Sequence, residues 1–427
     1  MSINRRDALK GMGGLAAAAA FGKLDAQLPP VPSTQLGTAV ELPRKQDFGI
    51  AEGYTYINAA FTHPMPKVTV EATRRYAEGR NQLGAAPAGA GGDGRGSRPD
   101  PRALFAELIN AKPTEVAYVP NTSTGENLVV NSLLLDRKFD GNVVTDWLHY
   151  DGALVHLLEL KKQGLDVRIV KPTKEFRIDL KDLERVVDGK TKLIELSSVA
   201  MYNGFQHDLK AVCDLAHAHG AYVYADIIHS AGAEPFDVKA SGVDFAACSS
   251  FKWLMGDFGL GFLYAKEELL PKIAHSQIGY YQLASMAGHY PPFDPEAEST
   301  PVTWSHRSDA RGAFEVGTIG GAIAAGLAAS LTYIKELGVA NIHTYRQPLL
   351  KKLRDEVPRI AGFALVTPPE STAGVITFAR KDVGTGELPR KLQAARVNVR
   401  FSRHWMRLSP SVYNDMNDID RFLEALS

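Results

Sequence analysis

The stretch that decides the fold is Asp244-Phe245-Ala246-Ala247-Cys248-Ser249-Ser250-Phe251-Lys252-Trp253. Its first part has the small, aromatic and apolar residues of a buried strand, and Lys252 is the first positive charge after it. Upstream, Ala221-Tyr222-Val223-Tyr224-Ala225 predicts a second buried strand that ends in Asp226. At the carboxyl edge of a parallel sheet, such an acid and amine can face one ligand. An ordinary structural ion pair is the alternative for this pair taken alone.

The surrounding sequence alternates between strand-like and helix-like segments. Short apolar runs predict strands at 115–119, 142–145, 167–170, 193–196, 222–225, 245–249 and 261–264. Helical patterns between them cover 152–163, 180–187 and 208–219. This alternation predicts an α/β fold with a mostly parallel sheet, and ligands then bind at the carboxyl ends of its strands.

The length of 427 residues suits two domains or one large α/β enzyme. We predict a signal and linker over 1–48, a large cofactor-binding domain over 49–310, and an interdomain helix with a smaller α+β domain over 311–427. The last part holds helical patterns at 320–337 and 342–357 and strands at 374–378 and 398–401. The Gly- and Ala-rich run 84–96 is either a mobile loop near a site or an ordinary connection.

The amino terminus, Asn4-Arg5-Arg6-Asp7-Ala8-Leu9-Lys10 followed by a Gly- and Ala-rich run, resembles a twin-arginine export signal. Ala8 stands where such signals usually carry phenylalanine. The resemblance implies export to the periplasm or beyond through the twin-arginine machinery. Cleavage candidates are imperfect, so an uncleaved anchor and a chance amphipathic tail stay open. The apolar run is shorter than the roughly 20 residues that span a bilayer.

Composition narrows the class of partner. The chain has 48 basic and 48 acidic residues, so no net charge attracts nucleic acid, and we expect a small-molecule substrate. Its two cysteines, Cys213 and Cys248, do not form a disulfide framework and are predicted to lie in the core. The pair His217 and His219 is too slight a pattern for a metal site, and none is predicted.

An anion site is predicted after the first strand of the alternating region. There Asn121-Thr122-Ser123-Thr124-Gly125 precedes a helical pattern. Free amides at a helix start bind anions, and hydroxyl groups add donors. Simple N-capping by Ser123 or Thr124 explains the segment equally well.

Together with Asp226 and Lys252, this segment resembles the class V aminotransferase family of fold-type I enzymes that depend on pyridoxal 5'-phosphate (PLP). That family includes cysteine desulfurases, kynureninase-like lyases and isopenicillin N epimerase-like proteins, and the resemblance runs from about Tyr56 to the C terminus. It implies that Lys252 binds the cofactor covalently and that Asp226 faces the pyridine nitrogen. It also implies phosphate contacts from Ser123, Thr124, Ser249 and, from a neighbouring subunit, Thr318.

The contact from Thr318 implies a homodimer with shared sites. Phe251 departs from the family pattern Ser-x-His-Lys, because it replaces the histidine and removes one hydrogen-bond donor. The resemblance further places His149 as a ring stacked on the pyridine, with Tyr150 as the rival. His229 and Asn203 resemble residues that contact the cofactor's phenolic oxygen or the substrate carboxylate, although both could be turn or core polar groups.

Arg407 begins Arg407-Leu408-Ser409-Pro410-Ser411-Val412-Tyr413-Asn414, which resembles the family stretch whose arginine binds the substrate carboxylate. Lys252 would also serve as the base for the Cα proton. Family desulfurases carry a cysteine nucleophile shortly before this arginine, whereas 397–407 contains no thiol.

We therefore expect an exported enzyme that acts at the Cα of an amino acid or an amino-acid-bearing secondary metabolite, by transamination or a related reaction. A C–S or other β-lyase and an epimerase are the alternatives within the family. A non-catalytic PLP-binding protein is the alternative of another class.

Overall fold

The computed structural model describes residues 40–83, 99–134, 140–287 and 302–426. The twin-arginine-like segment, the cleavage candidates and the run 84–96 lie outside the described residues. The predictions made for them are therefore not addressed by the structure.

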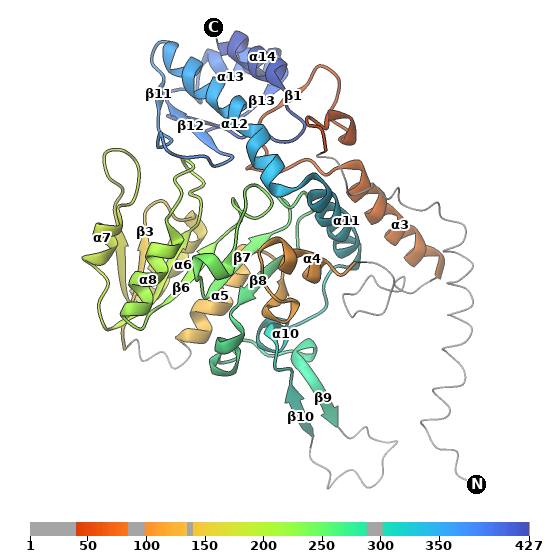
Figure 1. The fold of residues 1–427 in the computed structure, drawn as a ribbon, viewed down its shortest axis with the longest axis vertical. Coiled ribbons are helices and arrows are strands. Elements are labelled where there is room, and N and C mark those ends of the chain that lie inside the picture. The colour runs from red at the N-terminus through yellow and green to blue at the C-terminus, as the bar shows by residue number, and fades with distance from the viewer. Residues whose placement is uncertain (1–39, 84–98, 135–139, 288–301, 427) are drawn as a thin grey trace.

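A seven-stranded sheet forms the centre of the molecule (Figure 1). In spatial order its strands are β2 (Val116–Val119), β8 (Gly261–Ala265), β7 (Phe245–Ser249), β6 (Tyr222–Asp226), β5 (Thr191–Ser197), β3 (Asn142–Asp146) and β4 (Asp166–Val170). Only β8 runs against its neighbours, since its pairings with β2 and β7 are antiparallel while those from β7 to β4 are parallel. The predicted α/β fold with a mostly parallel sheet is confirmed.

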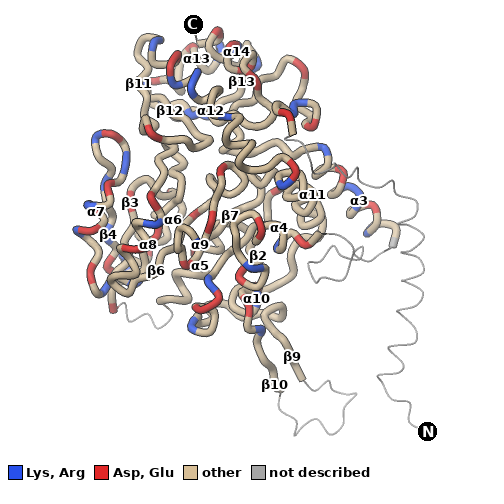
Figure 2. The backbone as a smooth tube through the Cα atoms, viewed as in Figure 1, with Lys and Arg blue, Asp and Glu red and all other residues tan. Residues whose placement is uncertain are grey.

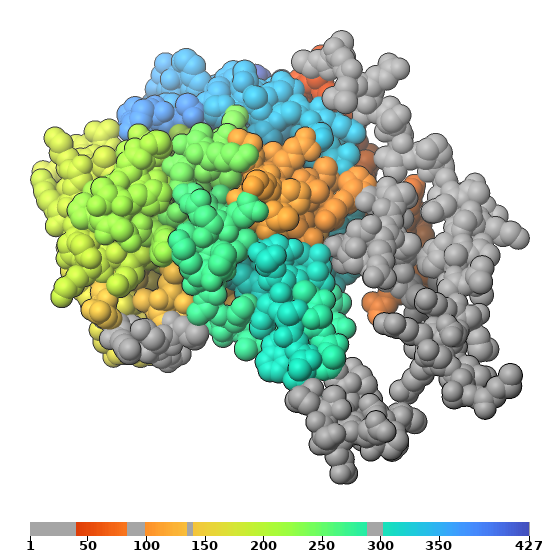
Figure 3. All heavy atoms as spheres, turned by 60° about the horizontal axis from the view of Figure 1, so that its bottom comes forward, coloured from red at the N-terminus to blue at the C-terminus, as the bar shows by residue number. Residues whose placement is uncertain are grey.

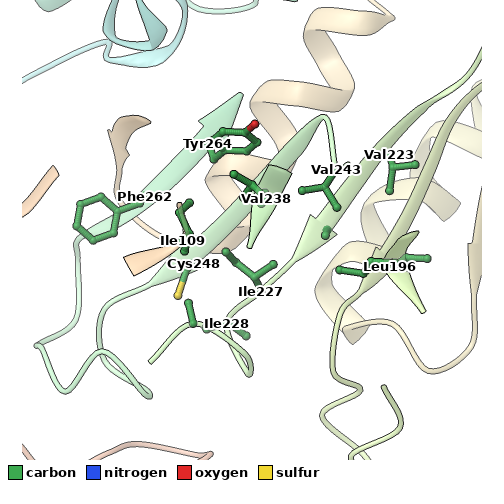
Figure 4. Close-up of a cluster of buried hydrophobic side chains, with 14 of the residues drawn as sticks. Ile109, Leu196, Val223, Ile227, Ile228, Val238, Val243, Cys248, Phe262 and Tyr264 are labelled. Carbon is green, nitrogen blue, oxygen red and sulfur yellow. The ribbon is translucent and has the colours of Figure 1, made fainter. Parts of the chain in front are cut away.

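The sheet has a hydrophobic core on each face, which explains why its strands are apolar throughout. Successive strand residues point to opposite faces. Accordingly Ala246 and Cys248 join one cluster, whereas Phe245 and Ala247 join the other. Figure 4 shows part of the first cluster, in which Cys248 lies among aliphatic side chains from neighbouring segments. This double burial is typical of parallel sheets covered by helices on both sides.

The covering helices come from the connections between strands. They are α4 (Pro101–Leu108), α5 (Thr122–Leu133), α6 (Asp151–Lys162), α7 (Leu180–Glu184), α8 (Leu209–Ala218) and α9 (Val238–Ser241). The segment α5 follows β2 directly and packs on β7, so the start of α5 lies beside the strand that leads to Lys252. The core cysteines behave as predicted, because Cys213 and Cys248 are both buried and free.

The C-terminal part contains a second, smaller sheet in the order β11 (Ala364–Leu365), β12 (Ile376–Ala379), β15 (Trp405–Leu408), β14 (Arg400–Phe401). The helices around it are α12 (Val339–Glu356), α13 (Glu387–Ala394) and α14 (Met416–Leu426), preceded by α11 (Gly321–Leu337). In Figure 3 this part, in blue, lies along one edge of the larger body.

The predicted strand 398–401 is two strands in the structure. Its beginning belongs to β13 (Val397–Asn398), which pairs in parallel with β1 (Thr55–Tyr56), while its end is β14. A segment near the start of the predicted large domain therefore packs with the C-terminal part. Conversely, α11 packs against α3 (Lys67–Leu83) and α4. The boundaries at 48 and 310 stay predictions.

A hairpin of β9 (Leu283–Ala287) and β10 (Thr303–His306) projects from the body next to α10 (Ala310–Phe314) (Figure 1). Basic and acidic residues are interspersed over the described part of the chain in Figure 2, in line with the zero net charge. By length and hydropathy, none of the described helices could span a bilayer by itself. The helix α11 and the segment Val339–Arg359 reach the required length and hydropathy only when they are taken together, and the two are bent by 72° relative to each other.

Candidate active site

Asp226 and Lys252 lie at the carboxyl ends of two adjacent strands. Asp226 is the last residue of β6, and Lys252 follows β7 by one turn. Both side chains are buried. Burial lowers the pKa of the Lys252 amine to about 8, although the Asp226 carboxyl opposes this shift. The lysine is therefore neutral for part of the time near neutral pH, as a nucleophilic amine must be.

The surroundings of Lys252 favour its neutral form in a second way. Its Nζ lies 3.1 Å from His229 Nε2, and the indole of Trp253 donates to His229 Nδ1 at 3.4 Å. Burial holds the pKa of His229 well below its ordinary value, so the imidazole is neutral. With Nδ1 accepting from Trp253, the single ring proton is on Nε2. His229 then donates to Lys252, which accepts as a free amine.

The buried Asp226 carboxyl has few partners that could stabilise a negative charge on it. Its Oδ1 accepts from the backbone N–H of Ile228 at 2.9 Å, and within the described ranges it forms no ion pair. Burial raises its pKa, against the opposing effects of His149 and Lys252. A buried acid of this kind gains from a cationic partner such as a protonated pyridine nitrogen.

The start of α5 and the end of β7 form a small polar cradle. Ser249 Oγ lies 2.8 Å from the backbone N of Thr122 and 2.9 Å from its hydroxyl, and Ser249 N donates to Thr122 Oγ1 at 3.0 Å. Asn121 caps the helix by accepting from Thr124 N and Thr124 Oγ1. The Thr124 hydroxyl is thus engaged in the cap, while Ser123 is half-buried beside it. Their predicted phosphate contacts stay predictions.

His149 follows β3 and is fully enclosed. Its Nδ1 lies 2.8 Å from Ser197 Oγ and its Nε2 lies 3.3 Å from Glu195 Oε1. Both partners belong to β5, so the imidazole plane is fixed from the neighbouring strand. The rival Tyr150 is exposed and is the N-cap residue immediately before α6. The structure therefore favours His149 over Tyr150 as the ring that a site at this sheet edge would use.

Arg407 lies on β15 and reaches the same region from the smaller sheet. Its Nη1 donates to Met201 O at 2.8 Å, and its buried Nε has no partner among the described residues. Burial, and then the charge of Arg400, lower the pKa of its guanidinium to about 10. A buried arginine with a free N–H and no acidic partner in the described ranges suits a carboxylate ligand.

Two predicted residues are not drawn into this cluster. The amide of Asn203 donates to Phe176 O at 2.6 Å and accepts from Phe205 N at 3.1 Å, so it holds a turn. Of the two roles that the sequence left open for Asn203, the structure therefore favours the turn. Thr318 is exposed in the segment before α11. Its predicted role at a neighbouring subunit's phosphate stays a prediction.

Three further residues of the site were not predicted from the sequence: Thr122, Trp253 and Glu195. Thr122 stands in the segment chosen for its hydroxyl groups, and Trp253 is the direct neighbour of Lys252. Glu195 gave the clearest signal, because a lone acid in the apolar run Leu193-Ile194-Glu195-Leu196 is unusual in a buried strand. Its partner in the fold was not visible from the sequence.

These residues fit PLP. The amine, the uncompensated acid, the enclosed imidazole and the polar helix start lie at one edge of the sheet, and each matches one part of that cofactor. When bound, PLP supplies an electron-withdrawing ring that stabilises negative charge at the substrate Cα. The fold and the site thus define a PLP-dependent enzyme of fold-type I.

The chain belongs to the class V aminotransferase family, whose model matches residues 55–422. It is 28% identical to a probable cysteine desulfurase of Methanothermobacter thermautotrophicus, over 84% of this chain and 86% of that protein. It is 29% identical to a cysteine desulfurase of Klebsiella pneumoniae, over 76% and 80%. The fold of the cysteine desulfurase from Thermococcus onnurineus NA1 superposes with a TM-score of 0.76 at 23% identity, covering 91% of this chain and 98% of that one.

A second solved structure is the cystine C-S lyase C-DES in complex with cysteine persulfide, with a TM-score of 0.73 at 20% identity and coverage of 88% and 98%. A mutant of C-DES carries glycine linked to PLP. The predicted family, fold type and cofactor are confirmed.

Proposed function

We propose that this protein is a PLP-dependent lyase that cleaves a C–S bond of a sulfur-containing amino acid by β-elimination. The relatives named above are cysteine desulfurases, and C-DES is named a cystine C-S lyase. These names support the lyase alternative of the sequence analysis over transamination.

The observation that carries the proposal is a lysine site without a usable thiol. Cys213 and Cys248 are the only cysteines of the chain, and both are buried. Burial raises the pKa of Cys213 to about 12 and that of Cys248 well above its ordinary value. A thiolate nucleophile is therefore disfavoured at both positions. Sulfur then leaves with the departing group instead of passing to an enzyme cysteine.

The residues suit such an elimination. Arg407 holds the substrate carboxylate, and the freed amine of Lys252 takes the Cα proton. The electron pair left at Cα forms the new Cα–Cβ double bond as the Cβ–S bond breaks, and sulfur leaves with that bond's electrons. Protonation of the sulfur and hydrolysis of the remaining enamine give a thiol or persulfide, pyruvate and ammonium.

The test is incubation of the holoenzyme with cystine, cysteine and S-alkyl cysteines in the absence of any oxo acid. We expect pyruvate and reduced sulfur in equal amounts, and neither from Lys252→Ala. Borohydride reduction should fix the cofactor on the peptide that holds Lys252. Amino transfer to an added oxo acid without pyruvate release would favour transamination instead. A persulfide found on Cys213 or Cys248 by mass spectrometry would contradict the elimination route.

We further propose a homodimer. The exposed position of Thr318 leaves it free to meet a second copy, and large apolar side chains are exposed on and near the projecting hairpin: Ile278 (71%), Tyr280 (73%), Met286 (47%) and Trp304 (60%). Exposed apolar groups of this size gather at interfaces. Light scattering should give twice the mass of the chain, and a monomer that retains full activity would refute the shared site.

Export remains a proposal that rests on Arg5-Arg6 and the Gly- and Ala-rich run after them. Cell fractionation should place the protein outside the cytoplasm, and Arg5→Lys with Arg6→Lys should retain it inside. If the wild type and the double lysine variant were distributed equally between the cytoplasm and the outside, the support for this export route would be lost.

A further inference from the structure

A row of buried ionisable side chains leads from His149 away from the cofactor site. His149 Nε2 lies 3.3 Å from Glu195 Oε1, and Glu195 is close enough to Glu126 for their carboxyl groups to hydrogen-bond. Glu126 Oε1 lies 2.9 Å from His156 Nδ1. The first three side chains are almost fully buried, whereas His156 has 13% of its side chain exposed. The row therefore reaches solvent at one end.

These four residues come from four elements. His149 follows β3, Glu195 lies on β5, Glu126 on α5 and His156 on α6. Two acids at the interface between a sheet and its covering helices are costly to bury unless they share partners. Nothing in the catalytic roles assigned above uses Glu126 or Glu195. Their retention inside the core therefore calls for another role.

The hydrogen-bond pattern indicates where the protons are. Glu195 Oε1 is engaged by His149, whereas the buried Oε2 has no partner among the described residues. Two ionised carboxylates in hydrogen-bonding contact would repel each other. A proton shared between the two carboxyl groups removes this repulsion and gives the orphaned oxygen a partner. Glu195 Oε1 accepts whichever carboxyl holds the proton, so His149 Nε2 carries a proton and Nδ1 accepts from the Ser197 hydroxyl.

We propose that Glu195, Glu126 and His156 form a proton-sharing chain that fixes the tautomer of His149. Glu195 is thus a positioning residue that acts through His149. Loss of the shared proton would place full negative charge on the carboxyl groups next to His149 Nε2 and strengthen that hydrogen bond.

The titration of the chain supports this arrangement. Burial raises the pKa of Glu195 to about 8 and, together with the charge of Glu195, raises that of Glu126 to about 7. Although burial lowers the pKa of His156, its hydrogen bond to Glu126 raises it overall. The other ionisable groups that face the pair are Asp226 and Tyr224, both on β6. The pair therefore keeps a shared proton at neutral pH and loses it under mildly alkaline conditions.

The inference rests on the site and not on which bond the enzyme breaks, so its test does not use turnover. The probe is the ¹⁵N spectrum of the histidine side chains in the PLP-loaded, full-length protein, with the His149 signals assigned by His149→Asn. We expect the wild-type signals to report a ring proton on Nε2, and to move as the neighbouring Glu195 ionises, with a midpoint of about 8.

Glu195→Gln is the decisive variant. The glutamine carbonyl accepts from His149 Nε2 and its amide donates to Glu126, so the variant mimics the shared-proton state but cannot ionise. The His149 signals should then stay constant through the same pH range. Glu159→Gln, an exposed change on the helix that carries His156, is the matched control and should leave the midpoint unchanged.

Two outcomes would overturn the proposal. The first is a His149 transition that persists in Glu195→Gln with the wild-type midpoint. The second is a wild-type His149 whose ring proton is on Nδ1 at neutral pH. Because neither measurement depends on elimination, failure of the proposed reaction would leave this result unaffected.

Discussion

Lys252 and Asp226 lie at the ends of adjacent strands, and burial moves the pKa of each toward its neutral form. At about 4 Å and an effective dielectric near 20, a carboxylate attracts a protonated ring nitrogen by roughly 4 kcal/mol. A bound cofactor would therefore give this buried acid a cationic partner, and the acid would keep the ring cationic. Burial of the Asp226 carboxylate is unfavourable in the cofactor-free protein, and the bound ring would compensate for it in the PLP-loaded protein.

Asp226→Ala tests the proposed attraction between the Asp226 carboxylate and the cofactor ring. We expect turnover to fall by about 10²-fold or more, because the ring loses its electrostatic partner. The free energy of unfolding of the cofactor-free protein should not fall, since an uncompensated buried acid is removed. Steady-state kinetics and chemical denaturation measure the two effects. Near-normal turnover in the loaded variant would refute the role of Asp226.

Trp253→Phe tests the control of the His229 tautomer. The variant keeps an aromatic ring but loses the N–H that donates to Nδ1. One neutral hydrogen bond is worth about 1 kcal/mol, so we expect turnover to fall about fivefold and the basic limb of the pH–rate profile to shift. An unchanged profile would show that Trp253 does not influence Lys252.

Arg407→Lys tests carboxylate binding. Lysine keeps the charge but not the planar pair of donors, so we expect KM for amino acids to rise about tenfold with a smaller change in kcat. Arg403→Lys is the matched control, because Arg403 is an exposed residue near Arg407 in the sequence and pairs with Asp382. A KM that stays constant in Arg407→Lys would place the carboxylate elsewhere.

At the scale of elements, the cradle for an anion depends on how closely α5 approaches β7. Gly125 makes this approach possible, since a Cβ at this position would lie 2.9 Å from the Cβ of Ala247. The contact brings the start of α5 within hydrogen-bonding distance of Ser249. Helix and strand therefore form the cradle jointly, and neither would form it alone.

Gly125→Ala should push the helix away from the strand. We expect the protein to lose about 1–3 kcal/mol of stability by overpacking, and its affinity for PLP to fall. Gly189→Ala is the matched control, because no atom lies within 4 Å of its added Cβ. Thermal unfolding and cofactor titration separate the two effects. Equal cofactor affinity in both variants would contradict the role of this close packing.

At the scale of the whole molecule, buried acids couple folding to pH. The folded-state pKa of Glu195 is about 8, against an ordinary value of 4.5. Between these two values the folded chain holds a proton that the unfolded chain has lost, so the contribution of this residue to stability falls as the pH rises.

Glu195→Gln should therefore remove part of the pH dependence of stability. The free energy of unfolding of the wild type, relative to the variant, should be highest in acid and should fall by a few kcal/mol as the pH rises from 4.5 to 8. Urea unfolding at several pH values measures the difference. A constant difference would show that Glu195 ionises normally in the folded protein.

The α/β class, the strand that ends in Asp226, the strand that precedes Lys252 and the helix start after β2 could all be predicted from the sequence alone. These features are local, because strand periodicity, turn residues and a charge at the end of an apolar run are visible within a few positions. The family pattern added the cofactor. Boundaries were less accurate where strands are short, as at 398–401, since pairing with β1 and not local preference divides that stretch.

Only the tertiary structure decided which polar groups meet. Asn203 lies in a well-matched segment, yet its amide is taken up by a turn, whereas Glu195 and Glu126 come from distant segments and face one another in the core. Trp253 is next to Lys252 in the sequence, but its hydrogen bond to His229 depends on how the segments that carry Trp253 and His229 pack together. Hydrogen bonds and desolvation depend on distance in space, and sequence spacing does not fix that distance for groups brought together by long-range packing.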